Sequence, residues 1–249
     1  MTIKPPTAAQ IPALRDLWQQ AFGDTEDYLD RFFETGFSFD RCRCVETDGK
    51  IAAALYWFDC SCREEKLAYL YAVATDTAFR GQGLCHRLMA DTHALLKENG
   101  YAGAVLVPGS ESLFRFYETM GYRTFGGIRE FTSVASAPAL PLRRVDAAEY
   151  AALRRALLPQ GGIVQEGATL AFLQTYAEFY TGGSILLAAV REDNHAFVPE
   201  LLGDAPAENI LAALGAKTGT FRTPGDTPFA MYLPLTSTEA PNYFGFALD

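Results

Sequence analysis

The sequence predicts an α/β protein made of two successive units, and three observations predict this class. Helical and extended patterns alternate through residues 1–134. A loop containing two glycines, FRGQGL, opens a long helical pattern in that part. The proline-containing stretch ASAPALP, 135–141, is typical of a linker, and helices and strands resume after it. We therefore expect a first domain over 1–134 and a second over 135–249.

The elements of the first unit follow from local patterns. Apolar residues at helical spacing predict a helix that begins after Thr7 and stops at Gly23, and TEDYLDRFFETGF predicts a second helix. The stretch RCRCVETDGKIAAALYWF predicts a hairpin that turns at Asp48 and Gly49. A third strand, KLAYLYAVAT, ends where the glycine loop begins, and the loop opens a helix over 83–99 that Gly100 terminates. A strand in GAVLVPG, a helix in SESLFRFYETMG and a strand in YRTFGGIREFTSV complete the unit.

The second unit begins like the first, with a strand followed by a helix for which Asp146 is the expected N-cap. The stretch GATLAFLQTYAEFY predicts another helix, SILLAAVR and AFVPELLG predict strands around the turn EDNH, and AENILAALG predicts a short helix. FAMYLPL and the terminal YFGFALD are expected as strands. This element order indicates a degraded copy of the first unit, because no comparable glycine loop precedes the helix after ELLGD.

Composition and charge exclude several classes of protein. The chain has 249 residues, 49% of them hydrophobic and 20% charged, with a formal net charge of -9. Such an acidic chain is a poor partner for duplex nucleic acid, which proteins bind through clustered Lys and Arg. Its apolar runs are far shorter than the roughly 20 residues that a membrane helix needs, and MTIKPPTAAQ lacks the apolar core of a signal peptide. We expect a cytoplasmic protein without membrane or nucleic-acid partners.

The five cysteines predict no metal site. Two C-x-C pairs, Cys42 with Cys44 and Cys60 with Cys62, lie on the predicted hairpin. The hairpin sets Cys42 opposite about residue 55 and leaves Cys60 roughly 17 Å further along the strand. Neither spacing is the C-x-x-C of structural zinc, so we expect free thiols and no bound metal.

The glycine loop predicts an anion site. The first amides of a helix have no internal partner and lie at the positive end of the helix dipole, and glycine permits positive φ and the close approach of a ligand. Successive amides from Gly81 to Cys85 therefore suit a pyrophosphate, and a side chain at Gly83 would obstruct it. A loop that only caps the helix is the alternative, because glycine loops do so in many α/β proteins.

A second motif accompanies the loop. FRFYETMGY follows after one helix and one strand, and the loop fits Q/R-x-x-G-x-G/A through Arg80 and Gly83, with Cys85 in the last place. Together they resemble the GNAT superfamily of acyl-CoA-dependent N-acetyltransferases, by motif over 66–125 and by element order before that. The resemblance implies a mixed, mostly antiparallel central sheet flanked by helices. It also implies a degenerate GNAT-like second unit, similar to the enhanced-survival aminoglycoside acetyltransferases without their third domain.

The resemblance implies acetyl-CoA as the co-substrate. In the family, the end of the third strand pairs with the pantetheine amides and the glycine loop binds the pyrophosphate. Ser110 stands where many relatives have an asparagine, and it either reaches the cofactor or caps its helix. The implied cofactor-binding residues are Val73, Ala74, Thr75, Arg80, Gly81, Gln82, Gly83, Leu84, Cys85 and Ser110.

Amide formation needs a proton acceptor for the amine and a proton donor for the departing thiolate. Tyr117 stands where many family members have the general acid, and a packed aromatic side chain is the alternative reading. The third strand has no acidic residue after Lys66, so similarity to tandem relatives implies the carboxylates of the terminal Asp249 as the general base. The alternatives are an ordinary solvated chain end and a water relayed through Tyr69 or Tyr71.

The implied function is transfer of an acetyl group from acetyl-CoA to a primary amine of a small molecule or peptide by direct attack. The alternative is an acyl-CoA-binding regulatory or scaffolding protein whose catalysis has lapsed. Acidic and aromatic residues of the second helix would suit an amine with an apolar body, although acidic surface helices also serve solubility alone; these residues are Glu26, Asp27, Tyr28, Asp30, Phe32 and Phe33. A homo-oligomer stays an open alternative to a monomer.

Overall fold

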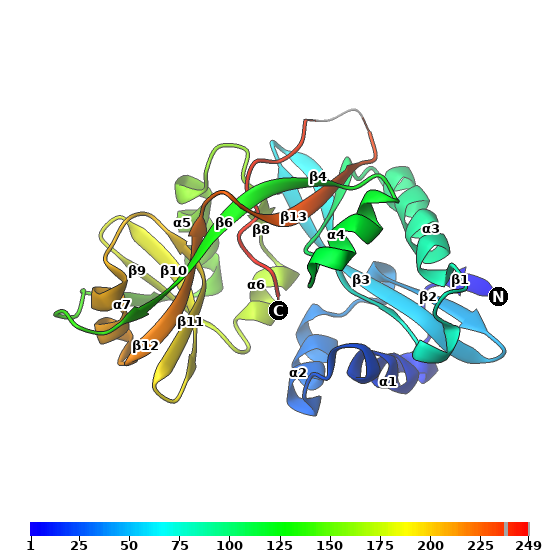
Figure 1. The fold of residues 1–249 in the computed structure, drawn as a ribbon, viewed down its shortest axis with the longest axis horizontal. Coiled ribbons are helices and arrows are strands. Elements are labelled where there is room, and N and C mark those ends of the chain that lie inside the picture. Colours follow the sequence, from blue (N-terminus) through cyan, green and yellow to red (C-terminus); the bar gives the residue numbers. More distant parts are fainter. Residues whose placement is uncertain (237–238, 249) are drawn as a thin grey trace. The chain divides into compact units, whose positions relative to one another are not determined.

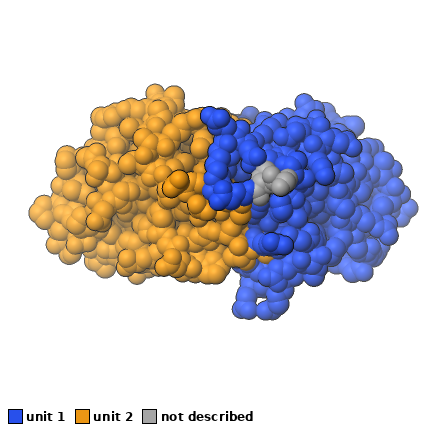
Figure 2. Space-filling model, turned by 90° about the horizontal axis from the view of Figure 1, so that it is seen from above, with its two compact units in different colours: residues 1–123, 232–239 blue, residues 124–231, 240–249 orange. Residues whose placement is uncertain are grey.

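A computed structural model describes residues 1–236 and 239–248. The chain forms two compact units, one from residues 1–123 with 232–239 and the other from 124–231 with 240–249 (Figure 2). Helices and strands alternate in both units, which confirms the α/β class. The division at residue 134 stays a prediction, since β6 (Arg123–Val134) and β13 (Thr227–Pro234) each contribute residues to both units.

The sheet of the first unit is mixed and mostly antiparallel, as predicted (Figure 1). Its strands follow in the order β1 (Thr2–Lys4), β2 (Cys42–Thr47), β3 (Lys50–Cys62), β4 (Glu65–Thr75) and β5 (Gly103–Leu106). Neighbours pair antiparallel except β4 and β5, which run parallel because a helical crossover joins them. Residues 51–58 of β3 are all buried, so both faces of this strand are covered.

Helices cover both faces of that sheet. α1 (Ile11–Phe22) and α2 (Glu26–Arg31) lie on one face, and α3 (Leu84–Glu98) and α4 (Glu111–Glu118) lie on the other (Figure 1). The predicted stop at Gly23 is confirmed, because this residue has φ 75 and its amide bonds the carbonyl of Gln19 at 2.9 Å. Short helical segments connect the larger elements: η1 (Ala8–Gln10), η2 (Phe32–Gly36), η3 (Phe39–Arg41) and η4 (Thr77–Phe79).

The predicted hairpin turn is confirmed. Asp48 and Gly49 have φ 51 and 74, the left-handed pair that a tight two-residue hairpin requires. Cys42 pairs with Tyr56, one position from the predicted partner, because the ladder is irregular between β2 residues 45 and 46. The four hairpin cysteines are buried thiols that form no disulfide bond.

The second unit is built on strands that follow in the order β13, β6, β12, β11, β10, β9 and β7. β11 and β12 pair parallel, whereas β12 with β6, β10 with β11, β9 with β10 and β7 with β9 pair antiparallel. Asp146 caps its helix as predicted, since its side chain accepts from the amide of Glu149 at 2.8 Å. The bounds are β7 (Arg143–Val145), α5 (Ala147–Leu157), β8 (Val164–Gln165), α6 (Ala168–Leu173), β9 (Glu178–Gly182), β10 (Ile185–Glu192), β11 (His195–Leu202), α7 (Ala207–Leu214) and β12 (Thr218–Pro224).

Two element predictions for the second unit are wrong. GATLAFLQTYAEFY is not one helix: α6 ends at Leu173 and β9 begins at Glu178, because the aromatic and β-branched run EFYTG pairs with β10. The described part of the terminal segment, 243–248, forms no strand. Tyr243 forms only an isolated parallel bridge with Gly162. Further along, the backbone of Phe246 bonds a side chain, since it accepts from Gln165 Nε2 at 3.0 Å and donates to Gln165 Oε1 at 3.3 Å. Asp249 lies outside the described residues.

Candidate active site

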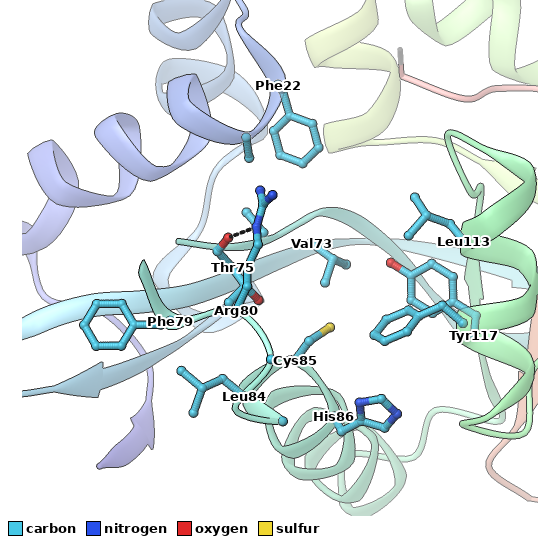
Figure 3. Close-up of a pocket in the computed structure, with 15 residues that line it drawn as sticks. Phe22, Val73, Thr75, Phe79, Arg80, Leu84, Cys85, His86, Leu113 and Tyr117 are labelled. Atoms are coloured by element: carbon cyan, nitrogen blue, oxygen red, sulfur yellow. Dashed lines mark hydrogen bonds between the residues drawn. The ribbon is translucent and has the colours of Figure 1, made fainter. Parts of the chain in front are cut away.

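A pocket of about 640 Å³ opens at the end of β4 within the first unit (Figure 3). Five elements line it: the C-terminal end of α1, the end of β4, the glycine loop, the first turn of α3 and one side of α4. The lining residues are Ala21, Phe22, Val73, Ala74, Thr75, Phe79, Arg80, Gly81, Gly83, Leu84, Cys85, His86, Leu113, Phe116 and Tyr117.

A β-bulge shapes the β4 side of this pocket. Residues 72 and 73 of β4 lie together opposite Leu55 of β3. Ala72 has φ 48, a left-handed conformation that costs a residue with a Cβ about 1 kcal/mol. β4 pairs with β5 only over residues 67–69 and then runs on to Thr75. The last residues of β4 therefore face the pocket rather than a paired segment of β5.

The glycine loop presents the N-terminus of α3 to the pocket. Gly81 and Gly83 have φ 76 and 72, and a Cβ at either position would meet no atom within 4 Å, so the backbone conformation is what favours glycine here. The first helical hydrogen bond of α3 joins the Arg87 amide to the Gly83 carbonyl at 3.2 Å, so the amides of residues 84–86 precede it. The first turn carries no acidic side chain. This helix end therefore suits an anion.

Tyr117 packs its ring and directs its hydroxyl into the pocket. The residue is 7% exposed, and its ring lies 5.4 Å from Phe116 and 5.7 Å from Tyr122. The hydroxyl points toward Val73 across the pocket (Figure 3), and no hydrogen bond joins it to another described residue. Burial raises the pKa of Tyr117 above its ordinary range, so the hydroxyl keeps its proton at physiological pH. Tyr117 is thus both a packed aromatic and an available proton donor.

Two further polar side chains shape the chemistry of the pocket. Burial raises the pKa of the Cys85 thiol to about 11, so this side chain is a neutral thiol at physiological pH. The exposed Arg80 donates from Nε to the Thr75 carbonyl at 3.2 Å, which holds its guanidinium over the end of β4 (Figure 3). Because no described lining residue is acidic, the charged groups of the pocket favour a negatively charged ligand.

The structure brings most of the predicted site residues together. Val73, Ala74, Thr75, Arg80, Gly81, Gly83, Leu84, Cys85 and Tyr117 line the one pocket. Gln82 does not, and its side chain lies near the Ala78 carbonyl at 3.5 Å. Ser110 does not line the pocket either. Its hydroxyl bonds that of Ser112 at 3.0 Å, and its side chain makes no capping bond to α4. Asp249 lies outside the described residues, so its predicted role stays a prediction.

Sequence reasoning missed six lining residues: Ala21, Phe22, Phe79, His86, Leu113 and Phe116. Helical spacing within α4 could have indicated one of them, since Leu113 lies four residues before Tyr117 and therefore shares a face with it. No local pattern marks Phe22, which reaches the pocket only because the end of α1 packs beside β4.

The acidic residues of α2 are already paired. Arg15 forms ion pairs with Glu26 and Asp30, the latter at 2.8 Å, and Arg31 pairs with Asp27 at 2.8 Å. None of these carboxylates lines the pocket. The α2 acids are therefore engaged in ion pairs, and their predicted contact with an amine stays a prediction.

Metal-ligand clusters and membrane-spanning helices are both absent from the described ranges. Over residues 1–236 and 239–248, no group of three or more His, Cys, Asp or Glu side chains could hold a metal ion. In the same part of the chain, no helix combines the length and the apolar composition that crossing a membrane requires.

The mixed sheet, the glycine loop at a helix N-terminus and the tyrosine opposite it define an α/β domain with an anion-binding pocket at the end of β4. Residues 2–125 match the family model described as an acetyltransferase (GNAT) domain. This part of the chain is therefore similar to GNAT acetyltransferase domains, and the predicted fold class is confirmed.

Solved structures of similar fold cover both units of the chain. A GCN5-related N-acetyltransferase from Anabaena variabilis matches with a TM-score of 0.74 and 16% identity, over 94% of this chain and 73% of that one. One from Kribbella flavida matches with a TM-score of 0.69 and 17% identity, over 93% and 70%. Eis1 from Mycobacterium abscessus matches with a TM-score of 0.60 and 11% identity, over 92% and 66%. At these identities the likeness shows the fold alone, so the specific tandem type stays a prediction. No curated protein sequence matches this chain significantly.

Proposed function

We propose that this protein transfers an acetyl group from acetyl-CoA to a primary amine by direct attack. The observation that carries the proposal is the placement of Tyr117, whose side chain is largely buried and whose hydroxyl enters the pocket beside the α3 N-terminus. The match of residues 2–125 to a GNAT domain supports acyl transfer, and the cytoplasm is the location proposed for it.

The pocket residues fit the cofactor. The amides of the glycine loop and the first turn of α3 are suited to a pyrophosphate, and Arg80 adds a positive charge to the same pocket, over the end of β4. Acetyl-CoA, when bound, would supply the thioester that the amine attacks. The backbone of residues 73–75 would orient the thioester end, and Tyr117 would give its proton to the sulfur that departs.

The proton acceptor for the amine is proposed on the resemblance alone. No described lining residue is a carboxylate, so Asp249 stays the candidate base. The same absence favours the second candidate function, an acyl-CoA-binding protein without turnover, because an amine that stays protonated cannot attack a thioester.

Release of free thiol from acetyl-CoA, measured with a panel of primary amines, tests the proposal. The expected result is turnover that depends on an amine and forms the N-acetyl product. A chain that lacks Asp249 is expected to keep acetyl-CoA affinity and to lose turnover, mainly at the lower end of the active pH range. Binding of acetyl-CoA without turnover on any amine would instead establish the second candidate function.

A further inference from the structure

The mouth of the pocket carries an exposed apolar pair. Among the described residues, five large hydrophobic side chains are exposed: Met1, Phe22, Phe39, Leu113 and Val134. Two of them, Phe22 at 48% exposure and Leu113 at 37%, line the same pocket although they come from α1 and α4. Gly23 ends α1 directly after Phe22, so the ring projects from a fixed helix end. Scattered exposed apolar residues are ordinary, but a convergent pair at a pocket marks a binding surface.

This pair lies away from the anion end of the pocket. Figure 3 shows Phe22 and Leu84 on opposite sides of the end of β4. Val73 lies between these two side chains, and the Tyr117 hydroxyl is directed toward it. The α3 N-terminus suits the negatively charged part of the cofactor. An amine that reacts beside Tyr117 would therefore extend its remaining atoms toward Phe22 and Leu113.

Charge limits which amines fit there. None of the described lining residues carries a carboxylate, while Arg80 supplies a positive charge. The carboxylates of Glu26, Asp27 and Asp30 in α2 are paired with Arg15 and Arg31. A second ammonium group on the acceptor would meet no carboxylate among the described lining residues, and the carboxylates proposed for Asp249 would be engaged with the reacting amine, which disfavours polyamines and aminoglycosides.

We infer that the acceptor is a monoamine with an apolar body, held between Phe22 and Leu113. This inference rests on the proposed function, since it names the substrate class of the same site. The apolar body leaves water when it packs against the two side chains, and the single amino group needs no carboxylate once it has lost its proton.

The test compares 2-phenylethylamine with spermidine as acceptors. We expect kcat/KM to be at least about tenfold higher for 2-phenylethylamine. Phe22→Ser should lower kcat/KM for 2-phenylethylamine about tenfold and leave the KM for acetyl-CoA unchanged. Phe39→Ser is the matched control, because Phe39 is 39% exposed and does not line the pocket, and it should change neither value. Equal or better turnover of spermidine would overturn the inference.

A binding measurement separates this inference from the proposed function. If no amine is acetylated, the proposed function fails, and calorimetric titration of 2-phenylethylamine into the CoA-saturated protein then decides the inference. Binding that is weakened by Phe22→Ser and not by Phe39→Ser supports an apolar amine site. No binding to the unsubstituted protein, or equal binding to both variants, overturns it.

Discussion

Tyr117→Phe is expected to lower kcat about a hundredfold while the Kd for acetyl-CoA stays unchanged. The substitution keeps the ring contacts with Phe116 and Tyr122 and removes only the hydroxyl that faces the pocket. Since burial raises the pKa of Tyr117, the donor keeps its proton, and loss of activity through its ionisation should begin only above the ordinary range of tyrosine. Steady-state kinetics and acetyl-CoA binding, measured on the same variant, check this result.

Tyr122→Phe is the matched control for this prediction. Tyr122 packs against Tyr117, but its hydroxyl bonds His93 Nε2 at 2.8 Å and does not line the pocket. Burial lowers the pKa of His93 to about 4, so the imidazole is neutral and the bond is an uncharged one. This control should lose about 1 kcal/mol of unfolding free energy and keep its kcat. Unchanged kcat in Tyr117→Phe would remove Tyr117 from the mechanism.

Arg154→Met is expected to lower the free energy of unfolding of the second unit by about 3–5 kcal/mol. Arg154 and Glu200 are 1% and 0% exposed, and their side chains meet through two bonds of 2.7 and 2.9 Å. Tyr150 and Tyr243 also donate to this carboxylate, at 3.3 and 3.0 Å. Removing the guanidinium leaves a buried carboxylate without its counter-charge. Urea unfolding followed by probes in each unit measures the loss.

Two variants distinguish the buried pair from an ordinary ion pair. Arg143 pairs with Glu149 at 2.6 Å in the same unit, but both side chains are exposed, so Arg143→Met should cost less than about 1 kcal/mol. The double variant Arg154→Met, Glu200→Leu removes both buried charges and should recover much of the lost stability. A small loss in Arg154→Met, equal to that of Arg143→Met, would show that the buried pair contributes little.

Local chemistry explains why much of the fold was predictable from sequence. Asp48 and Gly49 identify the hairpin turn, and Gly23 and Asp146 identify helix ends, because each residue type has a conformational or capping preference that acts within a few positions. The pocket residues of the glycine loop and Tyr117 were found through motifs whose members lie close together in the chain.

The features that the sequence did not predict depend on distant partners. The helical pattern ALRRALLP does not indicate that Arg154 is buried, because its partner Glu200 lies 46 residues away on β11. Ala72 adopts positive φ although alanine has no preference for it, because Tyr71 before the bulge and Ala74 after it are both paired with β3. The terminal segment YFGFALD was expected as a strand, yet Gln165 and Glu200 hold it through side-chain bonds. Phe22 and Leu113 come together only in the folded unit.

The central claim is that the glycine loop at the α3 N-terminus binds acetyl-CoA. Thermal unfolding with and without acetyl-CoA, on the unsubstituted protein, Gly83→Glu and Gly100→Glu, tests it most directly. Gly100 is the matched control, because it lies beyond the C-terminal end of α3, away from the glycine loop. Its φ of 77 is close to the 72 of Gly83, and a Cβ at either position meets no atom within 4 Å.

At one hundred times the dissociation constant, acetyl-CoA should stabilise the unsubstituted protein and Gly100→Glu by about 2.7 kcal/mol. Gly83→Glu should lose this stabilisation, because a carboxylate then stands at the helix end that would receive the pyrophosphate. No stabilisation of the unsubstituted protein, or equal stabilisation of Gly83→Glu, would contradict the claim that this loop is the coenzyme site.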